Sequence, residues 1–304
     1  MITEQTSRKS NKNLNDAKAA KKDEFYTLYQ DVEKELVHYK DNFKNKIIYC
    51  NCDDTETSSF WKYFSENFDD LGLKKLVATH YHPKEPTYKI ELNKHGGEAI
   101  KTKLSDNGDF RNKECIDILK DADVIVTNPP FSLFREFINQ LIEHKKDFIV
   151  LGRTINVIYK NMFPLMKDRK INYGVNYNFA TYFKIPEDYE AQKIDEQGNK
   201  YAKVTAISWF TTFDLENNEI FKDEHKHYNE EEYPKTDDGR CIICKSYKLL
   251  PCDYMGDIAV PITMFKKVNL DKYEIVGITE NFSYGQIFLK KKKLYTKLII
   301  RRII

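Results

Sequence analysis

The chain has 304 residues, of which 41% are hydrophobic, so it can bury one sizeable core with a smaller attachment. No apolar run approaches the roughly 20 residues of a membrane span, and the polar residues 1–22 contain no signal-peptide core. Six cysteines are too few for a disulfide scaffold in a chain of this length, which indicates reduced thiols. These features predict a cytoplasmic protein.

The net charge is only +2, but the charges are unevenly distributed. Segment 214–232 carries eight acids and two lysines, whereas segment 281–304 carries seven basic residues and no acid. Clustered Lys and Arg side chains neutralise phosphates and release counterions, so the C-terminal segment is a candidate nucleic-acid contact. The candidate residues are Lys290, Lys291, Lys292, Lys293, Arg301 and Arg302. A solvated basic face is the competing interpretation.

The order of predicted elements indicates an α/β protein. Residues 1–22 lack aromatic side chains and predict a flexible basic arm. Beyond this arm, apolar runs and helical periodicities alternate. Helices are expected over 32–43, 59–67, 116–120 and 133–145, strands over 46–52, 76–79, 123–127 and 148–152, and a loop or hairpin over 84–102.

This alternation predicts a doubly wound, mostly parallel sheet covered by helices on both faces. Ligands of such sheets bind outside the carboxyl ends of the strands. Segments 181–185 and 205–213 follow without a full helix between them, so we expect an antiparallel hairpin at the sheet edge. We place a main domain over 23–214 and a C-terminal region over 215–304.

The strongest motif is Asn128-Pro129-Pro130-Phe131, which directly follows the apolar strand 123–127 and precedes a predicted helix. Two adjacent prolines fix two φ angles, and Pro129 keeps Asn128 out of the α region. The result is a rigid turn that presents a carboxamide and backbone carbonyls at the end of a strand.

Such a turn suits methylation of an exocyclic amine on a purine, whose lone pair is delocalised into the ring. The Asn128 side-chain oxygen and the Pro129 carbonyl can accept the two amine hydrogens while the methyl arrives. Phe131 can stack on a base that has been extruded from the duplex. Catalysis then depends on positioning and on placed dipoles. A structural turn that happens to contain two prolines is the alternative interpretation.

The sequence resembles the EcoRI-type adenine-specific DNA methyltransferases over nearly the whole chain beyond residue 22. The resemblance rests on long motifs, which are 23–27 (Asp-Glu-Phe-Tyr-Thr), 49–54 (Tyr-Cys-Asn-Cys-Asp-Asp), 108–111 (Gly-Asp-Phe-Arg), 123–136, 260–263 and 273–277. It implies the class I fold of S-adenosylmethionine-dependent methyltransferases, with target recognition in 215–304. It also implies an N6-adenine methyltransferase of a bacterium, phage or mobile element, which acts on double-stranded DNA. The resemblance further implies a restriction endonuclease that cuts the same site and does not contact the methyltransferase.

The resemblance also implies the cofactor site. Tyr26 and Thr27 match positions at which related enzymes contact the methionine end of S-adenosylmethionine. Asp109 and Phe110 match the loop that usually contacts its adenine. Asn51, Asp53 and Asp54 follow the first strand, where the cofactor crosses the sheet. From the residues alone, an Asx turn with a core aromatic is the alternative at Asp109-Phe110.

Two positions depart from most methyltransferases. The turn after the first strand contains no glycine, and Thr79-His80-Tyr81 stands where an acid usually holds the ribose hydroxyls. The EcoRI-type family itself lacks a standard glycine loop, so the first departure is minor. The second leaves the ribose ligand unassigned.

Other interpretations remain open at this stage. Methylation of RNA or of a protein amide uses a similar turn, and a DNA-binding relic without turnover is the non-enzymatic alternative. Cys241 and Cys244 have the spacing of half a zinc site, but a second clean pair is missing, so no metal is predicted. Trp209 and Phe210 are expected in the core rather than in a base pocket.

Overall fold

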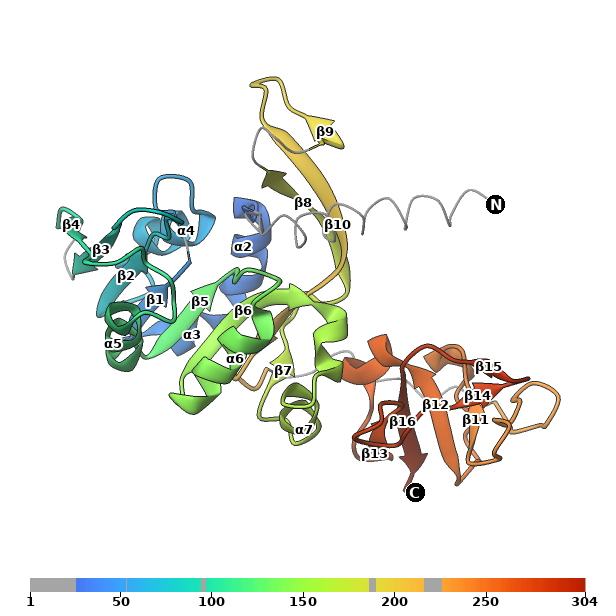
Figure 1. The fold of residues 1–304 in the computed structure, drawn as a ribbon. Helices are drawn as coiled ribbons and strands as arrows, with labels where there is room; N and C mark the ends of the chain where they lie inside the picture. The colour runs from blue at the N-terminus through green and yellow to red at the C-terminus, as the bar shows by residue number, and fades with distance from the viewer. Residues whose placement is uncertain (1–25, 53, 94–96, 186–189, 216–225, 304) are drawn as a thin grey trace. The chain divides into compact units, whose positions relative to one another are not determined.

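The computed structural model describes residues 26–303, except 53, 94–96, 186–189 and 216–225. The predicted arm over 1–22 and Asp53 therefore lie outside the described residues. The chain divides into two compact units, which are taken separately below (Figure 1). The first unit contains the chain up to Asn156 and Ile171–Asp214, and the second contains Val157–Lys170 and Leu215–Ile304.

The first unit is built on one large sheet. Its strand order in the described chain is β4-β3-β2-β1-β5-β6-β10-β7, with β8 and β9 also paired to β10. The four central strands, β2, β1, β5 and β6, are parallel, and antiparallel strands extend the sheet on both sides. The bounds are β1 Ile47–Cys50, β2 Lys75–Thr79, β3 Tyr88–Asn93, β4 Ile100–Lys103, β5 Val124–Thr127, β6 Asp147–Arg153, β7 Asn172–Tyr173, β8 Phe179–Ile185, β9 Lys193–Ile194 and β10 Lys200–Thr211.

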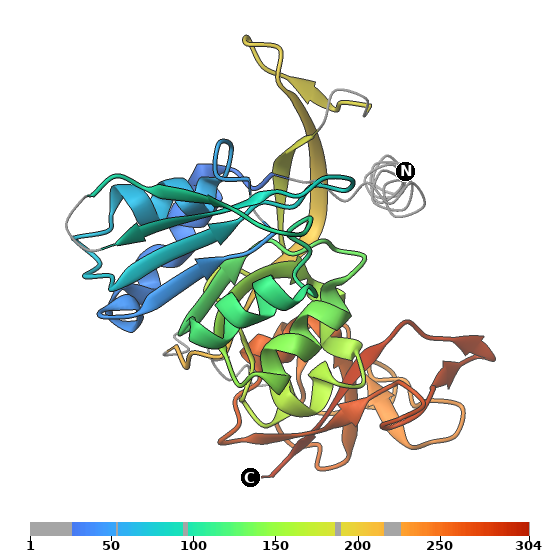
Figure 2. The same ribbon diagram turned by 60° about the vertical axis from the view of Figure 1, so that its left-hand side comes forward.

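Helices cover both faces of this sheet (Figure 2). Trp209 and Phe210 are neighbours on β10 and therefore point to opposite faces. The Trp209 ring meets Phe60 of α4 at 6.0 Å between centroids, and Phe210 meets Phe134 of α6 at 5.5 Å. This confirms the doubly wound α/β class. The helices of this unit are α2 Tyr29–Leu36, η1 Val37–Tyr39, α3 Lys40–Phe43, α4 Ser59–Glu66, α5 Lys113–Asp121 and α6 Phe134–Glu143.

The strand order defines where a ligand can bind. After β1 the chain moves outward through β2, β3 and β4, and then returns to form β5 on the other side of β1. The order therefore reverses between β1 and β5, and ligands of open α/β sheets bind at the carboxyl ends of such strands. Asn51 follows β1 and Asn128 follows β5, so two predicted site residues stand at this switch point.

Several elements differ from their predicted bounds. The helix expected over 32–43 starts earlier and changes to a 3₁₀ turn at Val37–Tyr39. The strand expected over 46–52 ends at Cys50, because Cys52 adopts a left-handed φ of 61°. Segment 84–102 forms the antiparallel hairpin of β3 and β4. The strand expected from 205 begins at Lys200 and lies between β6 and β7, inside the sheet instead of at its edge.

The second unit is a smaller, mostly antiparallel structure. Its four-stranded sheet has the order β11-β12-β16-β13, and β14 and β15 form a separate hairpin. Phe163 of α7 meets Phe265 at 6.3 Å, which packs segment 157–170 into this unit. Among the described residues, no helix has the length and apolar character needed to cross a membrane. The bounds are α7 Met162–Lys167, β11 Cys241–Ile243, η3 Tyr247–Leu249, β12 Asp257–Pro261, η4 Ile262–Lys267, β13 Tyr273–Ile278, β14 Phe288–Leu289, β15 Lys292–Lys293 and β16 Lys297–Arg302, while η2 Thr154–Ile158 spans the division between the units.

Candidate active site at the carboxyl ends of the parallel strands

The Asn-Pro-Pro-Phe turn is fixed at both of its ends. On one side, the Thr127 hydroxyl at the end of β5 donates to the backbone carbonyl of Asn51, which ties the turn to the end of β1. On the other side, the Pro130 carbonyl accepts a hydrogen bond from the Leu133 amide at 2.9 Å, one residue before α6. Pro129 is buried and Asn128 is half-buried. The turn is therefore a rigid connection between a central strand and a helix.

Phe131 is held by the neighbouring strand β8. Its ring meets Phe183 edge to face, with centroids 6.1 Å apart and an interplanar angle of 89°. Phe183 itself is fully buried. Edge-to-face aromatic pairs are favourable and orient both rings. The orientation of Phe131 therefore depends on β8, a strand that is more than 50 residues away in sequence.

Two buried oxygens near this edge have no hydrogen-bond partner among the described residues. They are the side-chain oxygen of Asn51, which is 1% exposed, and the hydroxyl of Thr27, which is 6% exposed. The Thr27 carbonyl accepts from the Ser59 hydroxyl at 2.7 Å, which places Thr27 at the start of α4. Buried polar groups are normally satisfied. These two oxygens therefore fit a site for a polar ligand at the end of β1.

Tyr26 and Asp54 are held by backbone and turn interactions. Tyr26 pairs with Lys184 of β8 through two backbone hydrogen bonds of 3.0 and 3.1 Å. The Asp54 carboxylate accepts from the Glu56 amide at 3.1 Å, from the Thr57 hydroxyl at 3.3 Å and from the Tyr88 hydroxyl at 3.3 Å. Asp54 thus closes the loop after β1, and a direct contact with the cofactor stays a prediction.

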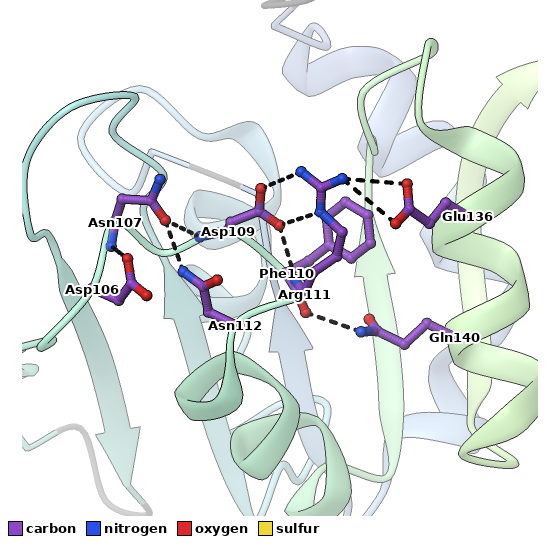
Figure 3. Close-up of polar contacts among 8 residues, drawn as sticks. All are labelled: Asp106, Asn107, Asp109, Phe110, Arg111, Asn112, Glu136 and Gln140. Atoms are coloured by element: carbon purple, nitrogen blue, oxygen red, sulfur yellow. Dashed lines mark hydrogen bonds and ion pairs between the residues drawn. The ribbon is translucent and has the colours of Figure 1, made fainter.

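The Asp109 loop lies between β4 and α5 in the chain, and its residues bond to Glu136 and Gln140 of α6 (Figure 3). Arg111 binds the Asp109 carboxylate with Nε at 2.8 Å and Nη2 at 2.6 Å, and its Nη1 lies 3.3 Å from the Glu136 carboxylate on α6. Partial burial opposes ionisation of Asp109, but the hydrogen bonds and charge of Arg111 outweigh it and hold the Asp109 pKa below its usual range. Asp109 is therefore an ionised acceptor whose position is set by Arg111.

Phe110 is a core residue in this structure. It is 3% exposed, its ring meets Phe137 edge to face at 5.2 Å, and its carbonyl accepts from Gln140 at 3.1 Å. The Arg111 amide donates to the Asp109 side chain at 2.9 Å, which is an Asx turn. These are the features of the structural alternative for Asp109-Phe110. Stacking of Phe110 on the cofactor adenine stays a prediction.

Gly108 brings this loop against the end of β2. It has a φ of 73°, and a Cβ at this position would lie 2.0 Å from the His80 carbonyl oxygen. Only glycine fits such a close approach of two backbones. His80 in turn bonds the Thr87 hydroxyl at 2.7 Å and stacks on Tyr88 at 5.3 Å. The ribose ligand, which the sequence left unassigned at Thr79-His80-Tyr81, stays unassigned.

An open pocket of about 510 Å³ also adjoins β2 and β3. Its lining includes His80, Tyr88, Lys101 and Lys103, but none of the predicted catalytic or cofactor residues. We therefore place the active site by the strand topology and by the partnerless oxygens.

The basic residues of the second unit fall into two groups. Lys290 and Lys291 form the two-residue turn between β14 and β15, both with positive φ, and both amides donate to the Asp237 carboxylate at 2.7 Å. All four side chains of Lys290–Lys293 are exposed. The lysines are therefore presented on an anchored hairpin.

The two arginines lie on β16, an interior strand of the four-stranded sheet. Arg301 is bound by Asp257 at 2.7 Å and by Glu274 at 3.3 Å, so its charge is compensated within the unit. The Arg302 guanidinium lies 5.8 Å from the centre of the Tyr273 ring. These contacts give Arg301 a structural role, and DNA contact by either arginine stays a prediction.

The cysteines of the Cys-x-x-Cys pair do not face one site. Cys241 is buried in an apolar cluster with Ile243, Ala259, Ile287 and Ile299. The Cys244 thiol donates to the Ser246 carbonyl. One ligand atom each of His227, Cys252 and Asp253 lies within 4.8 Å of the others, but His227 and Asp253 are exposed, and the His227 Nδ1 is already within hydrogen-bond distance of the Asp253 carboxylate, at 3.0 Å. The two cysteines of the motif are explained by packing.

These observations define a doubly wound α/β fold with a candidate polar site at the β1–β5 switch point, beside an Asn-Pro-Pro-Phe turn. Comparison with known proteins agrees with this description. The family profile described as "Adenine-specific methyltransferase EcoRI" matches residues 13–300. The chain belongs to this family of enzymes.

Three curated relatives resemble the chain over nearly their whole length. The type II methyltransferase M.EcoRI of Escherichia coli is 36% identical, covering 96% of this chain and 97% of the relative. M.MgeORF184P of Mycoplasma genitalium is 36% identical, with 94% and 92% covered. M.MpnI of Mycoplasma pneumoniae is also 36% identical, with 93% and 91% covered.

Among solved structures, a putative RNA methyltransferase, PH1948 from Pyrococcus horikoshii, is similar with a TM-score of 0.33 and 11% identity. That similarity covers 63% of this chain and 88% of the other.

Proposed function

We propose that this enzyme transfers the methyl group of S-adenosylmethionine to the N6 amine of adenine at a specific site in double-stranded DNA. The observation that carries the proposal is the rigid Asn128–Phe131 turn at the β1–β5 switch point, in a chain of the adenine-specific family. The type II methyltransferase names of its relatives support DNA as the substrate. A restriction endonuclease that cuts the same site, without contacting this enzyme, is the proposed companion in the cytoplasm.

The residues at the end of β1 fit the methionine part of S-adenosylmethionine. The Asn51 oxygen can accept from its ammonium group, and the Thr27 hydroxyl can donate to its carboxylate, which would satisfy both buried oxygens. Asp109 can accept from the exocyclic amine of the cofactor adenine. When bound, the cofactor supplies an electrophilic methyl group. Tyr26, Asp53, Asp54 and Phe110 belong to the same proposed site.

The protein then has to make the target amine a better nucleophile. Because the Asn128 oxygen and the Pro129 carbonyl belong to one rigid turn, both acceptors can be fixed before the base arrives. Hydrogen bonds from the N6 amine to these two oxygens favour a pyramidal nitrogen, whose lone pair is directed at the methyl group. Preorganised dipoles of this kind need no rearrangement at the moment of reaction. The base must be extruded from the duplex to reach this turn.

Replacing Phe131 with alanine should reduce the single-turnover rate by roughly 10-fold, because a stacking surface for the extruded base is lost. The amine chemistry at Asn128 should survive. A target adenine opposite a mismatched base is easier to extrude and should recover part of the lost rate. Phe131→Leu serves as the control, since it keeps the contact with Phe183 but removes the aromatic face. An equal loss on matched and mismatched duplexes would contradict the stacking role.

Replacing Lys290–Lys293 with glutamine should weaken binding to every duplex sequence alike, because phosphate contacts carry no sequence information. The slope of log affinity against log salt should become shallower, by up to about 0.9 for each lost phosphate contact. Arg301 is left out of this surface because two carboxylates already compensate its charge. Fluorescence anisotropy over a salt series measures both effects. Unchanged affinity and slope would show that the hairpin is a solvated face.

The proposal is tested by methyl transfer from tritiated S-adenosylmethionine to three acceptors, namely duplex DNA, RNA and protein. Label in duplex DNA alone is expected. Label in RNA or in protein amides would show that the substrate is RNA or protein instead of DNA. Absence of label in every acceptor would indicate a DNA-binding protein without turnover.

A further inference from the structure

A three-stranded arm rises from the catalytic unit beside the proposed active site. It consists of Thr181–Ile185 of β8, the strand β9, and the outer part of β10, Lys200–Val204. The inner part of β10 pairs with β6 only from Ile207, which lies opposite Arg153 at the carboxyl end of β6. Lys200–Val204 therefore extends past the edge at which the parallel strands end. Figures 1 and 2 both show these strands protruding from the sheet.

A local irregularity separates the arm from the sheet. The register between β8 and β10 shifts between Val204 and Ile207, and Ala206 adopts a left-handed φ of 57°. Bulges of this kind bend a strand and re-aim its side chains. The positive φ is unfavourable for alanine, so the rest of the structure must stabilise this bend. The bend that separates the arm from the sheet is thus a defined part of the structure of the catalytic unit.

The two faces of the arm have different chemistry. One face contains the buried residues Phe183 and Ala202, which lie opposite each other in the register. The other face is formed by two cross-strand rows, in which Lys184 and Lys193 flank Tyr201, and Lys203 lies opposite Tyr182. Because alternate residues share a face, these five side chains lie together. The arm therefore carries three lysines interleaved with two tyrosines.

This lysine–tyrosine face is partly exposed, and its side chains make local contacts. Lys193 and Lys203 are exposed, and their Nζ atoms lie 5.7 and 5.8 Å from the centre of the Tyr182 ring. Asp195 is a nearby acid, whose carboxylate accepts from the Asn199 amide at 2.8 Å and from the Tyr201 hydroxyl at 2.9 Å. Lys193 and Lys203 face solvent, and Lys184 is half-buried.

The arm is also attached directly to the proposed active site. Phe183, on the buried face, contacts Phe131 of the catalytic turn, and Lys184 pairs with the backbone of Tyr26. We infer that the lysine–tyrosine face binds the sugar–phosphate backbone of duplex DNA next to the extruded adenine. Lysines bind phosphates as point charges without reading sequence, and tyrosines pack against sugars and bases. This inference rests on the proposed function and adds a DNA contact on the catalytic unit itself.

The test compares two triple variants that remove the same charge. The arm variant is K184Q/K193Q/K203Q. The control is K44Q/K74Q/K145Q, which changes exposed lysines that precede β1, β2 and β6, at the opposite edge of the same sheet. Binding to a duplex DNA of arbitrary sequence is measured by anisotropy over a salt series, and cofactor binding by calorimetry reports the integrity of the site.

The arm variant should bind duplex DNA on the order of 10- to 100-fold more weakly near 0.1 M salt, with the salt slope reduced by about 2 to 3. The control variant should bind like the wild type, and both variants should bind the cofactor normally. If the wild type binds DNA but the arm variant matches the control, the inference is overturned while the proposed function stands. If the wild type binds no DNA, the proposed function itself fails.

Discussion

Replacing Asn128 with alanine is expected to slow methyl transfer by about 100- to 1000-fold, because one of two preorganised acceptors for the target amine is lost. Alanine tolerates the extended backbone that Pro129 imposes on the preceding residue. The turn should also persist, since it is held by the Thr127 hydroxyl and by the Pro130–Leu133 hydrogen bond, neither of which involves the Asn128 side chain. The Pro129 carbonyl therefore remains as the second acceptor. Cofactor binding should change little.

The measurement is a single-turnover rate with saturating enzyme and cofactor on duplex DNA. Asn139→Ala is the matched control, because it removes an exposed carboxamide from the adjoining helix α6 and should leave the rate within about 2-fold of the wild type, as ordinary for a surface substitution. A wild-type rate in Asn128→Ala would show that the turn is structural, and the catalytic assignment would have to be abandoned.

Replacing Glu35 with alanine is expected to lower the free energy of unfolding by about 3 to 5 kcal/mol, because several buried donors lose a charged acceptor. Glu35 lies on α2 and is fully buried. Its carboxylate accepts from the Tyr39 hydroxyl at 2.7 Å and from the Val175 and Asn176 amides at 2.8 Å each. The Asn176 side chain donates a further bond of 2.8 Å. Glu35 therefore joins α2 to the loop between β7 and β8.

Urea unfolding followed by circular dichroism measures this effect. Glu33→Ala is the control, since Glu33 lies on the same helix but is exposed, and its replacement should change the unfolding free energy by no more than about 0.5 kcal/mol. Glu35→Gln keeps the shape but places a donor among donors, so it should fall between the other two variants. A decrease in unfolding free energy of less than about 1 kcal/mol in Glu35→Ala would contradict this prediction, because it would mean that water replaces the carboxylate at no large cost.

The parts of the site that could be predicted from sequence are those determined locally. The two prolines fix the catalytic turn whatever the rest of the chain does, and the apolar strands that precede Asn51 and Asn128 can be recognised by composition alone. The parallel order of these strands then follows from the intervening helices. For the same reason, the doubly wound fold can be predicted without knowledge of any tertiary contact.

The parts that could not be predicted depend on distant residues. The sequence leaves two roles open for Phe110, cofactor stacking and core packing, and its burial depends on Phe137, on a helix that follows the catalytic turn. Glu35 looked like an ordinary helical acid, because its partners lie about 140 residues further along the chain. The lysine–tyrosine face of the arm could not be predicted for the same reason, since these side chains share a face only through the register of β8, β9 and β10.

The most direct test of the central claim is to identify the methylated product. Duplex DNA is incubated with the enzyme and S-adenosylmethionine, digested to nucleosides, and analysed by mass spectrometry against standards, with Asn128→Ala in parallel. The account predicts N6-methyldeoxyadenosine as the product, reduced at least 100-fold in Asn128→Ala, as expected for loss of one preorganised polar partner. Methyl groups on any other atom of the DNA, or equal product from the two proteins, would contradict it.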